Sequence, residues 1–160
     1  MAVQLGASAV AARAHEEVFA YWSSLRRGGR LPSRHDLQPF RLKRLLPTIS
    51  LIDIGEGQTY RQRLAGTGLY SVYGREITGR DLAEVYSAQA VDYWREQLDI
   101  VVAERRPLVG CHNLGWRGSP HMSILWQRLP LASNGRDVDM ILGYDAVVGS
   151  QTDSSGIRAA

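Results

Sequence analysis

The stretch Tyr60–Leu82, which reads YRQRLAGTGLYSVYGREITGRDL, decides how the fold of this chain is interpreted. It changes its hydrophobic period partway along and contains four glycines among large side chains. Residues 60–65 alternate so that Tyr60, Gln62 and Leu64 share one face, which is the two-residue period of a strand. We therefore expect a strand that delivers the chain into a turn and a short helix.

The second half of the stretch predicts the turn and the helix. Gly66 ends the strand, and the hydroxyl of Thr67 is placed to cap a short helix over residues 68–73. Gly74 is placed to end that helix in a left-handed conformation. Gly79 marks a second break in the chain.

An amphipathic helix is predicted over residues 7–27, with Ser8 as a possible cap and Gly28 and Gly29 beyond its end. Its apolar residues recur every three or four positions, at Val10, Ala14, Val18, Trp22 and Leu25. The helix can dock on another surface, or it can cover the sheet of its own domain. For the first alternative the predicted dimer interface is Val18, Phe19, Trp22 and Leu25.

The remaining pattern completes an α+β fold. We expect an ordered connector at 30–47 with a short helix, strands at 48–54, 108–116, 121–131 and 138–147, and a helix at 87–104. The first two strands form a hairpin and the last three a meander. This order predicts one five-stranded antiparallel sheet with helices on one face. The domain organisation is 1–29 for the N-terminal helix, 30–148 for the sheet domain and 149–160 for a flexible tail.

Composition excludes several classes of protein. The 160 residues carry 19 basic and 16 acidic side chains, and the basic ones are scattered, so nucleic-acid binding is not expected. The single cysteine, Cys111, allows no intrachain disulfide and fits a reducing compartment. The sequence has neither a secretion signal nor a membrane-spanning run. We expect a cytoplasmic protein that makes no use of a membrane.

The order of elements resembles the PAS fold, and five short motifs make the resemblance more specific. They are 30–36 (RLPSRHD), 45–47 (LLP), 60–67 (YRQRLAGT), 73–80 (YGREITGR) and 129–131 (LPL). Together they resemble a bacterial PAS-like subfamily that was formerly catalogued as a domain of unknown function. The resemblance covers roughly residues 21–144.

This resemblance implies a sensory or interaction module for signal transduction, with a pocket between the sheet and the crossover helices. PAS domains bind very different ligands, so the fold does not select one. The length leaves no room for an attached output domain, so we expect the output to pass through a protein partner in trans or through self-association.

Candidate ligand-binding residues surround the turn where a PAS pocket opens. Arg63 can pair with an anionic ligand, Thr67 and Arg75 flank the turn, and Tyr73 can stack or close the pocket. The structural alternatives are an internal ion pair between Arg63 and a carboxylate such as Asp81, and a capping role for Thr67. The candidate apolar lining, which can equally be ordinary core, consists of Tyr93, Trp94, Met122 and Trp126.

The motifs do not support a cofactor. Photosensory PAS domains place a reactive cysteine in a helical motif, whereas Cys111 lies in a predicted strand and is interpreted as a buried structural thiol. Haem-binding PAS domains usually supply a histidine from the crossover helix, and residues 87–104 contain none. The four histidines show no metal-binding spacing. Flavin, haem and metal are therefore unsupported, and the cofactor is unknown.

No catalytic motif is present, and we expect the protein not to be an enzyme. The leading hypothesis is a stand-alone sensor or adaptor that binds a small molecule or a protein partner and signals through a homodimer. The alternatives are an interaction module without a ligand and, third, a small enzyme that depends on Arg63 or His112.

Overall fold

The computed structural model describes residues 2–149, with side chains from residue 8 onward. Its helices are α1 (Ala2–Ser24), α2 (Leu69–Tyr73), α3 (Leu82–Val85) and α4 (Ala88–Glu104). Its strands are β1 (Ile49–Gly55), β2 (Thr59–Ala65), β3 (Leu108–Leu114), β4 (Ser119–Leu131) and β5 (Met140–Gly149). The predicted flexible tail lies, apart from its first residue, outside the described residues.

The five strands form one antiparallel sheet in the order β2-β1-β5-β4-β3. The hairpin β1–β2 and the meander β3–β4–β5 are both confirmed. They are joined through α2, α3 and α4, because a crossover has to carry the chain from one edge of the sheet to the other. The predicted α+β class and sheet are therefore confirmed.

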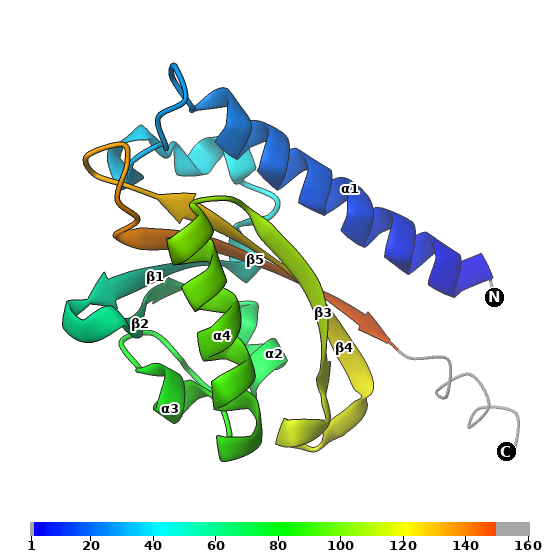
Figure 1. Cartoon of the computed structure of the whole chain (residues 1–160). Coiled ribbons are helices and arrows are strands. Elements are labelled where there is room, and N and C mark those ends of the chain that lie inside the picture. The colour runs from blue at the N-terminus through cyan, green and yellow to red at the C-terminus, as the bar shows by residue number, and fades with distance from the viewer. Residues whose placement is uncertain (1, 150–160) are drawn as a thin grey trace, which may run out of the picture.

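Helices lie on both sides of the sheet (Figure 1). We call the face under α2, α3 and α4 the inner face, and the face under α1 and the connector the outer face. Each face has its own apolar cluster. Trp94, Trp126 and Ile124 lie in the inner cluster, whereas Val18, Trp22 and Leu129 lie in the outer one.

Helix α1 belongs to the core of its own chain. Val18 and Trp22 are buried in the outer cluster, and the Trp22 Nε1 donates a hydrogen bond to the Pro130 carbonyl at 2.9 Å. The helix begins at Ala2, so Ser8 lies inside it and the predicted cap was wrong. It ends at Ser24, before the glycine pair that was expected to stop it.

The connector contains three short 3₁₀ turns, at Arg34–Asp36, Pro39–Leu42 and Leu46–Thr48, in place of one short helix. The last of them lies against the end of β2. A Cβ on Gly66 would come within 2.2 Å of the Leu46 carbonyl oxygen and 2.4 Å of the Pro47 oxygen. Only a glycine permits this close approach of two backbone segments.

A bulge in β2 changes the face on which Leu64 lies. Leu51 pairs with Leu64 but Ile52 pairs with Gln62, so Arg63 is the extra residue. Gln62 is buried, while Leu64 is 47% exposed and lies with Leu51 on the outer face. The prediction that Leu64 continues the face of Gln62 was wrong, because one extra residue reverses the alternation.

The turn after β2 agrees with the prediction in part. Helix α2 has Gly68 at its N-cap and no side-chain cap, so the predicted cap by Thr67 was wrong. Gly74 ends the helix in the left-handed region with φ of 75°, as expected. Gly79 has φ of 80°, which confirms the second break.

Candidate functional site

A fully buried ion pair lies at the centre of the inner face. Arg128 on β4 and Asp145 on β5 are each 1% exposed, and Arg128 Nη1 lies 2.8 Å from Asp145 Oδ1. The same nitrogen donates to the carbonyls of Gln127 at 2.9 Å and Tyr144 at 3.4 Å. A buried pair of this kind requires further hydrogen bonds to offset the loss of water around both charges.

A glycine on β5, Gly143, leaves room in the sheet for the guanidinium of Arg128. Gly143 pairs with Arg128 across the β4–β5 ladder and with Ser50 across the β1–β5 ladder. A Cβ at this position would lie 2.4 Å from Ser50 Oγ and 3.2 Å from Arg128 Nη1. A side chain at position 143 would therefore clash first with the Ser50 hydroxyl and would also crowd the Arg128 guanidinium.

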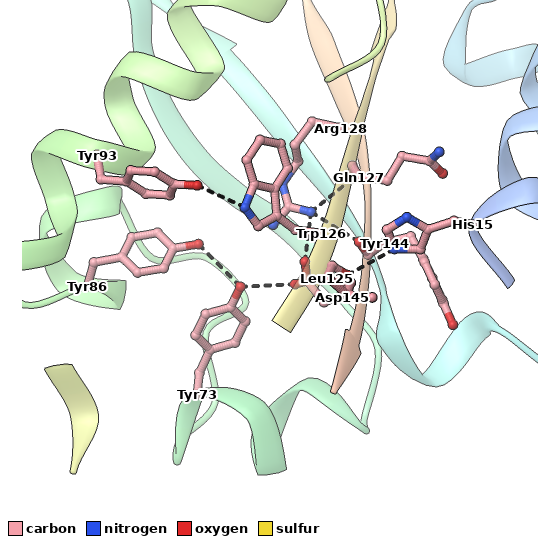
Figure 2. Close-up of polar contacts among 10 residues, drawn as sticks. All are labelled: His15, Tyr73, Tyr86, Tyr93, Leu125, Trp126, Gln127, Arg128, Tyr144 and Asp145. Carbon is pink, nitrogen blue, oxygen red and sulfur yellow. Dashed lines mark hydrogen bonds and ion pairs between the residues drawn. The ribbon is translucent and has the colours of Figure 1, made fainter. Parts of the chain in front are cut away.

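Tyrosines from the crossover helices contact the ion pair (Figure 2). The Tyr73 hydroxyl donates to Asp145 Oδ2 at 3.0 Å, and the Tyr86 oxygen lies 3.3 Å from that of Tyr73. Burial raises the pKa of Tyr86 to about 12 and raises that of Tyr73 well above its ordinary value. Both hydroxyls consequently stay protonated and serve as hydrogen-bond donors.

Aromatic rings enclose the guanidinium. Arg128 Cζ lies 4.9 Å from the Trp94 ring centre and 5.8 Å from that of Trp126, which are cation–π distances. Burial lowers the pKa of Arg128, but the neighbouring charge of Asp145 more than offsets this, so the pKa is raised. Arg128 therefore carries its charge under all ordinary conditions.

Several buried polar atoms in this cluster have no hydrogen-bond partner among the described residues. They are Arg128 Nε, Trp94 Nε1 and His112 Nε2. The His112 ring stacks on Tyr93 at 4.5 Å, and burial lowers the pKa of His112. An unpaired buried polar atom is costly, so each of these atoms is a hydrogen-bonding position that the described side chains leave unused.

The cluster also connects to α1 through the sheet. Leu125 directly precedes Trp126, and Tyr144 directly precedes Asp145. Because side chains alternate along a strand, Leu125 and Tyr144 make their contacts on the outer face. The Nε2 atom of His15 on α1 lies 2.9 Å from the Leu125 carbonyl oxygen, and the His15 and Tyr144 rings make a T-shaped contact with centroids 5.5 Å apart. Figure 2 shows His15 and Tyr144 on one side of the two strands and Tyr73, Tyr86 and Tyr93 on the other.

The structure brings together four of the seven predicted ligand-binding residues. Tyr73, Trp94 and Trp126 are buried in the inner cluster, and Met122 packs against it. The predicted apolar space is occupied by these side chains themselves.

The other three predicted residues lie apart from the inner cluster. Arg63 is exposed and pairs with Asp53 at 3.2 Å, so it binds a carboxylate of its own chain, as the structural alternative predicted, but the partner is Asp53 and not Asp81. Asp81 pairs with Arg61 instead. Arg75 donates to the backbone carbonyls of Glu84 and Val85, and Thr67 lies in a groove on the outer face.

Sequence reasoning named neither Arg128 nor Asp145, because it considered the basic side chains only as a scattered set. A signal was present. Arg128 interrupts the apolar run from Leu125 to Leu131, and Asp145 interrupts the apolar strand that was expected beside it. Opposite charges within two adjacent apolar strands indicate a buried pair.

The four predicted interface residues of α1 divide between the interior and the surface. Val18 and Trp22 are buried within the chain, which agrees with the alternative that the helix covers its own sheet. Phe19 is 44% exposed and Leu25 is half-buried. Phe19 lines a shallow outer groove together with Val109 of β3, which is 58% exposed.

Cys111 is exposed on β3, so its interpretation as a buried structural thiol was wrong. It lies on the edge strand of the sheet, where it lines the same shallow groove as Phe19 of α1. Within residues 2–149 no three histidine, cysteine or acidic side chains come together as a metal site. In the same part of the chain, every helix is too short or too polar to span a bilayer.

The strand order and the crossover define an α+β domain with the fold that the sequence resembles. The chain belongs to the PAS domain family, because the family model described as "PAS domain" matches residues 10–145. Domains of this family generally act as sensory modules and commonly mediate dimerisation and signalling contacts. A search of curated proteins gives no match.

Solved structures share the fold at low sequence identity. The PAS domain of Bordetella pertussis BvgS is 18% identical, with a TM-score of 0.54 over 75% of this chain and 93% of that one. The Rhodobacter sphaeroides LOV protein is 14% identical, with a TM-score of 0.51 over 75% of its chain and 77% of this one. At these identities the likeness concerns the fold alone.

Proposed function

We propose that this protein is a cytoplasmic sensory or adaptor module in bacterial signal transduction. It binds a small molecule in the inner cluster or a protein partner on its surface, and it signals through a change in association. The observation that carries the proposal is the chain of contacts from α4 through Arg128 and Asp145 to His15 on α1.

The contacts support a ligand response for a physical reason. A polar molecule that hydrogen-bonds Arg128 Nε or Trp94 Nε1 changes the position of the guanidinium and thus of Asp145. Asp145 and Tyr144 are adjacent on β5, and Tyr144 contacts His15. A two-state arrangement of α1 on the outer face would convert this shift into a signal.

The second candidate is an interaction module without a ligand, and the dense aromatic filling of the inner cluster favours it. Native mass spectrometry of the gently purified protein, beside the same sample denatured, separates the two. A reproducible extra mass that is lost on denaturation supports the sensor. A clean apo mass together with an unchanged thermal stability across a small-molecule library contradicts it.

Homodimerisation is the proposed mode of output, and the exposed part of α1 is its proposed surface. Phe19 and Val109 leave apolar area in contact with solvent on either side of the same shallow groove. We expect Phe19→Asp to weaken self-association at least tenfold in sedimentation velocity, because a carboxylate would be desolvated. Phe40→Asp is the matched control, since Phe40 is 68% exposed on the connector. Equal effects of the two variants contradict the proposed surface.

A further inference from the structure

A separate cavity of about 700 Å³ lies on the outer face, between the connector and the adjoining ends of β1 and β2. This volume is within the range of small-molecule sites, roughly 300–1,000 Å³. Its walls are mainly branched aliphatic side chains: Leu37, Leu42, Leu46, Ile49, Leu51 and Leu64. We call it the connector groove. The sheet separates it from Arg128 and the inner cluster.

The bulge in β2 supplies one wall of the connector groove. In a regular strand, with Arg63 paired like its neighbours, Leu64 would lie two positions after Gln62 and therefore on the inner face with it. The bulge turns Leu64 into the groove, where 47% of it remains exposed. Bulges often re-aim a side chain beside a functional site.

Close backbone contacts fix the connector, which forms the opposite wall of the groove, against the end of β2. Gly66 and Gly68 contact the connector backbone so closely that a Cβ would lie 2.2 Å from the Leu46 oxygen and 2.9 Å from the Pro47 oxygen, respectively. On the far side, the Tyr21 hydroxyl accepts a hydrogen bond from the Gln38 backbone N–H at 2.6 Å. The cavity is therefore built from fixed backbone segments.

The charges in the connector groove have one sign. Arg34 and Lys43 line it, and neither forms an ion pair within the described part of the chain. No aspartate or glutamate lines it. A nearby cation, Arg44, is by contrast paired with Glu17 at 3.0 Å. An occupant with an apolar body and an anionic head matches both the walls and the free cations.

We propose that the connector groove binds a single-chain amphipathic anion, namely a free medium- or long-chain fatty acid. The acyl chain lies against the leucines, and the carboxylate is bound by Arg34 and Lys43. The size of the cavity and its closure by the connector favour a small molecule over a helix of a partner protein. The proposal is independent of any ligand in the inner cluster.

The test uses cis-parinaric acid, a naturally fluorescent fatty acid, with the full-length protein below the concentration at which micelles form. Dodecanoate is expected to displace the probe, while dodecanol and dodecyltrimethylammonium are expected to do so at least tenfold less well. Equal displacement by all three compounds would overturn the proposal, because the head group would then play no part. Binding to phosphatidylglycerol vesicles without binding of monomeric dodecanoate would overturn it as well.

Two matched variants locate the site. Arg34→Glu with Lys43→Glu is expected to weaken dodecanoate binding at least tenfold. Arg41→Glu with Arg136→Glu changes the net charge by the same amount at exposed positions outside the groove and is expected to leave affinity within twofold. Equal losses in both double variants would contradict specific binding by the groove. Leu64→Ser tests the apolar wall at an exposed position, and unchanged affinity in this variant would contradict the role of the bulge.

Discussion

Replacing Asp145 by Asn tests whether the charge of Asp145 holds the inner cluster together. The substitution keeps the shape of the side chain but removes the charge that Arg128 Nη1 contacts at 2.8 Å and Tyr73 Oη at 3.0 Å. The guanidinium then remains buried without a counter-charge. Breaking a buried pair from one side costs about 3–5 kcal/mol. That is a large share of the roughly 5–15 kcal/mol by which folded domains are stable.

Urea unfolding measures this loss. With a denaturant slope of about 1–3 kcal/mol per molar, a loss of about 3–5 kcal/mol lowers the midpoint of Asp145→Asn by about 1–5 M at an unchanged slope. Asp92→Asn, at an exposed carboxylate on α4, is the control and is expected to stay within about 0.5 kcal/mol of the parent. Replacing both partners, with Arg128→Met and Asp145→Leu, is expected to recover at least half of the loss, because no charge is then buried. A loss below about 1 kcal/mol for Asp145→Asn would refute the reasoning, because it would mean that water reaches the guanidinium.

Three further outcomes are expected. Burial lowers the pKa of His15 and His112, so the stability that these neutral side chains contribute is present above the ordinary histidine pKa and is lost as the pH falls. The urea midpoint should therefore drop between pH 7.5 and 5.5, and it should drop less in His15→Gln. A midpoint that rises over this pH range would contradict the sign of the pKa shifts. Gly66→Ala should cost about 1–3 kcal/mol because its Cβ meets the connector backbone, whereas Asp92→Asn, the same exposed control, should be near neutral; equal midpoints would argue against the close approach. Trp22→Ala should lower the stability of the monomer by about 3–5 kcal/mol, which calorimetry at low concentration can measure, and an unchanged melting temperature would mean that α1 does not lie on the sheet.

The sequence was informative where local rules determine structure. Glycine, asparagine and proline at the turns, together with β-branched runs, predict the hairpin and the meander within a few residues. The spacing of apolar residues likewise predicts α4, with Ser87 directly before its first residue. These features depend on neighbours along the chain.

The features that were missed depend on contacts between distant segments. The bulge at Arg63 is set by the register between β1 and β2, and no single-strand pattern identifies which residue is extra. Arg128 and Asp145 are separated by 17 positions and meet only because β4 and β5 pair. The candidate residues Arg63 and Arg75 were chosen for their closeness to the turn in sequence, yet in the fold they bind a carboxylate and backbone carbonyls of their own chain.

The attachment of α1 has a consequence for how two copies can meet. Its buried side chains, such as Val18 and Trp22, contact the sheet, while the chain between helix and connector is a short turn with Gly28 and Gly29 at φ of 57° and 79°. If that turn opens, the helix of one molecule can occupy the outer face of another and recover the same contacts. Such an exchange costs little in contact energy, so protein concentration and the strain of the turn would decide between monomer and swapped pair.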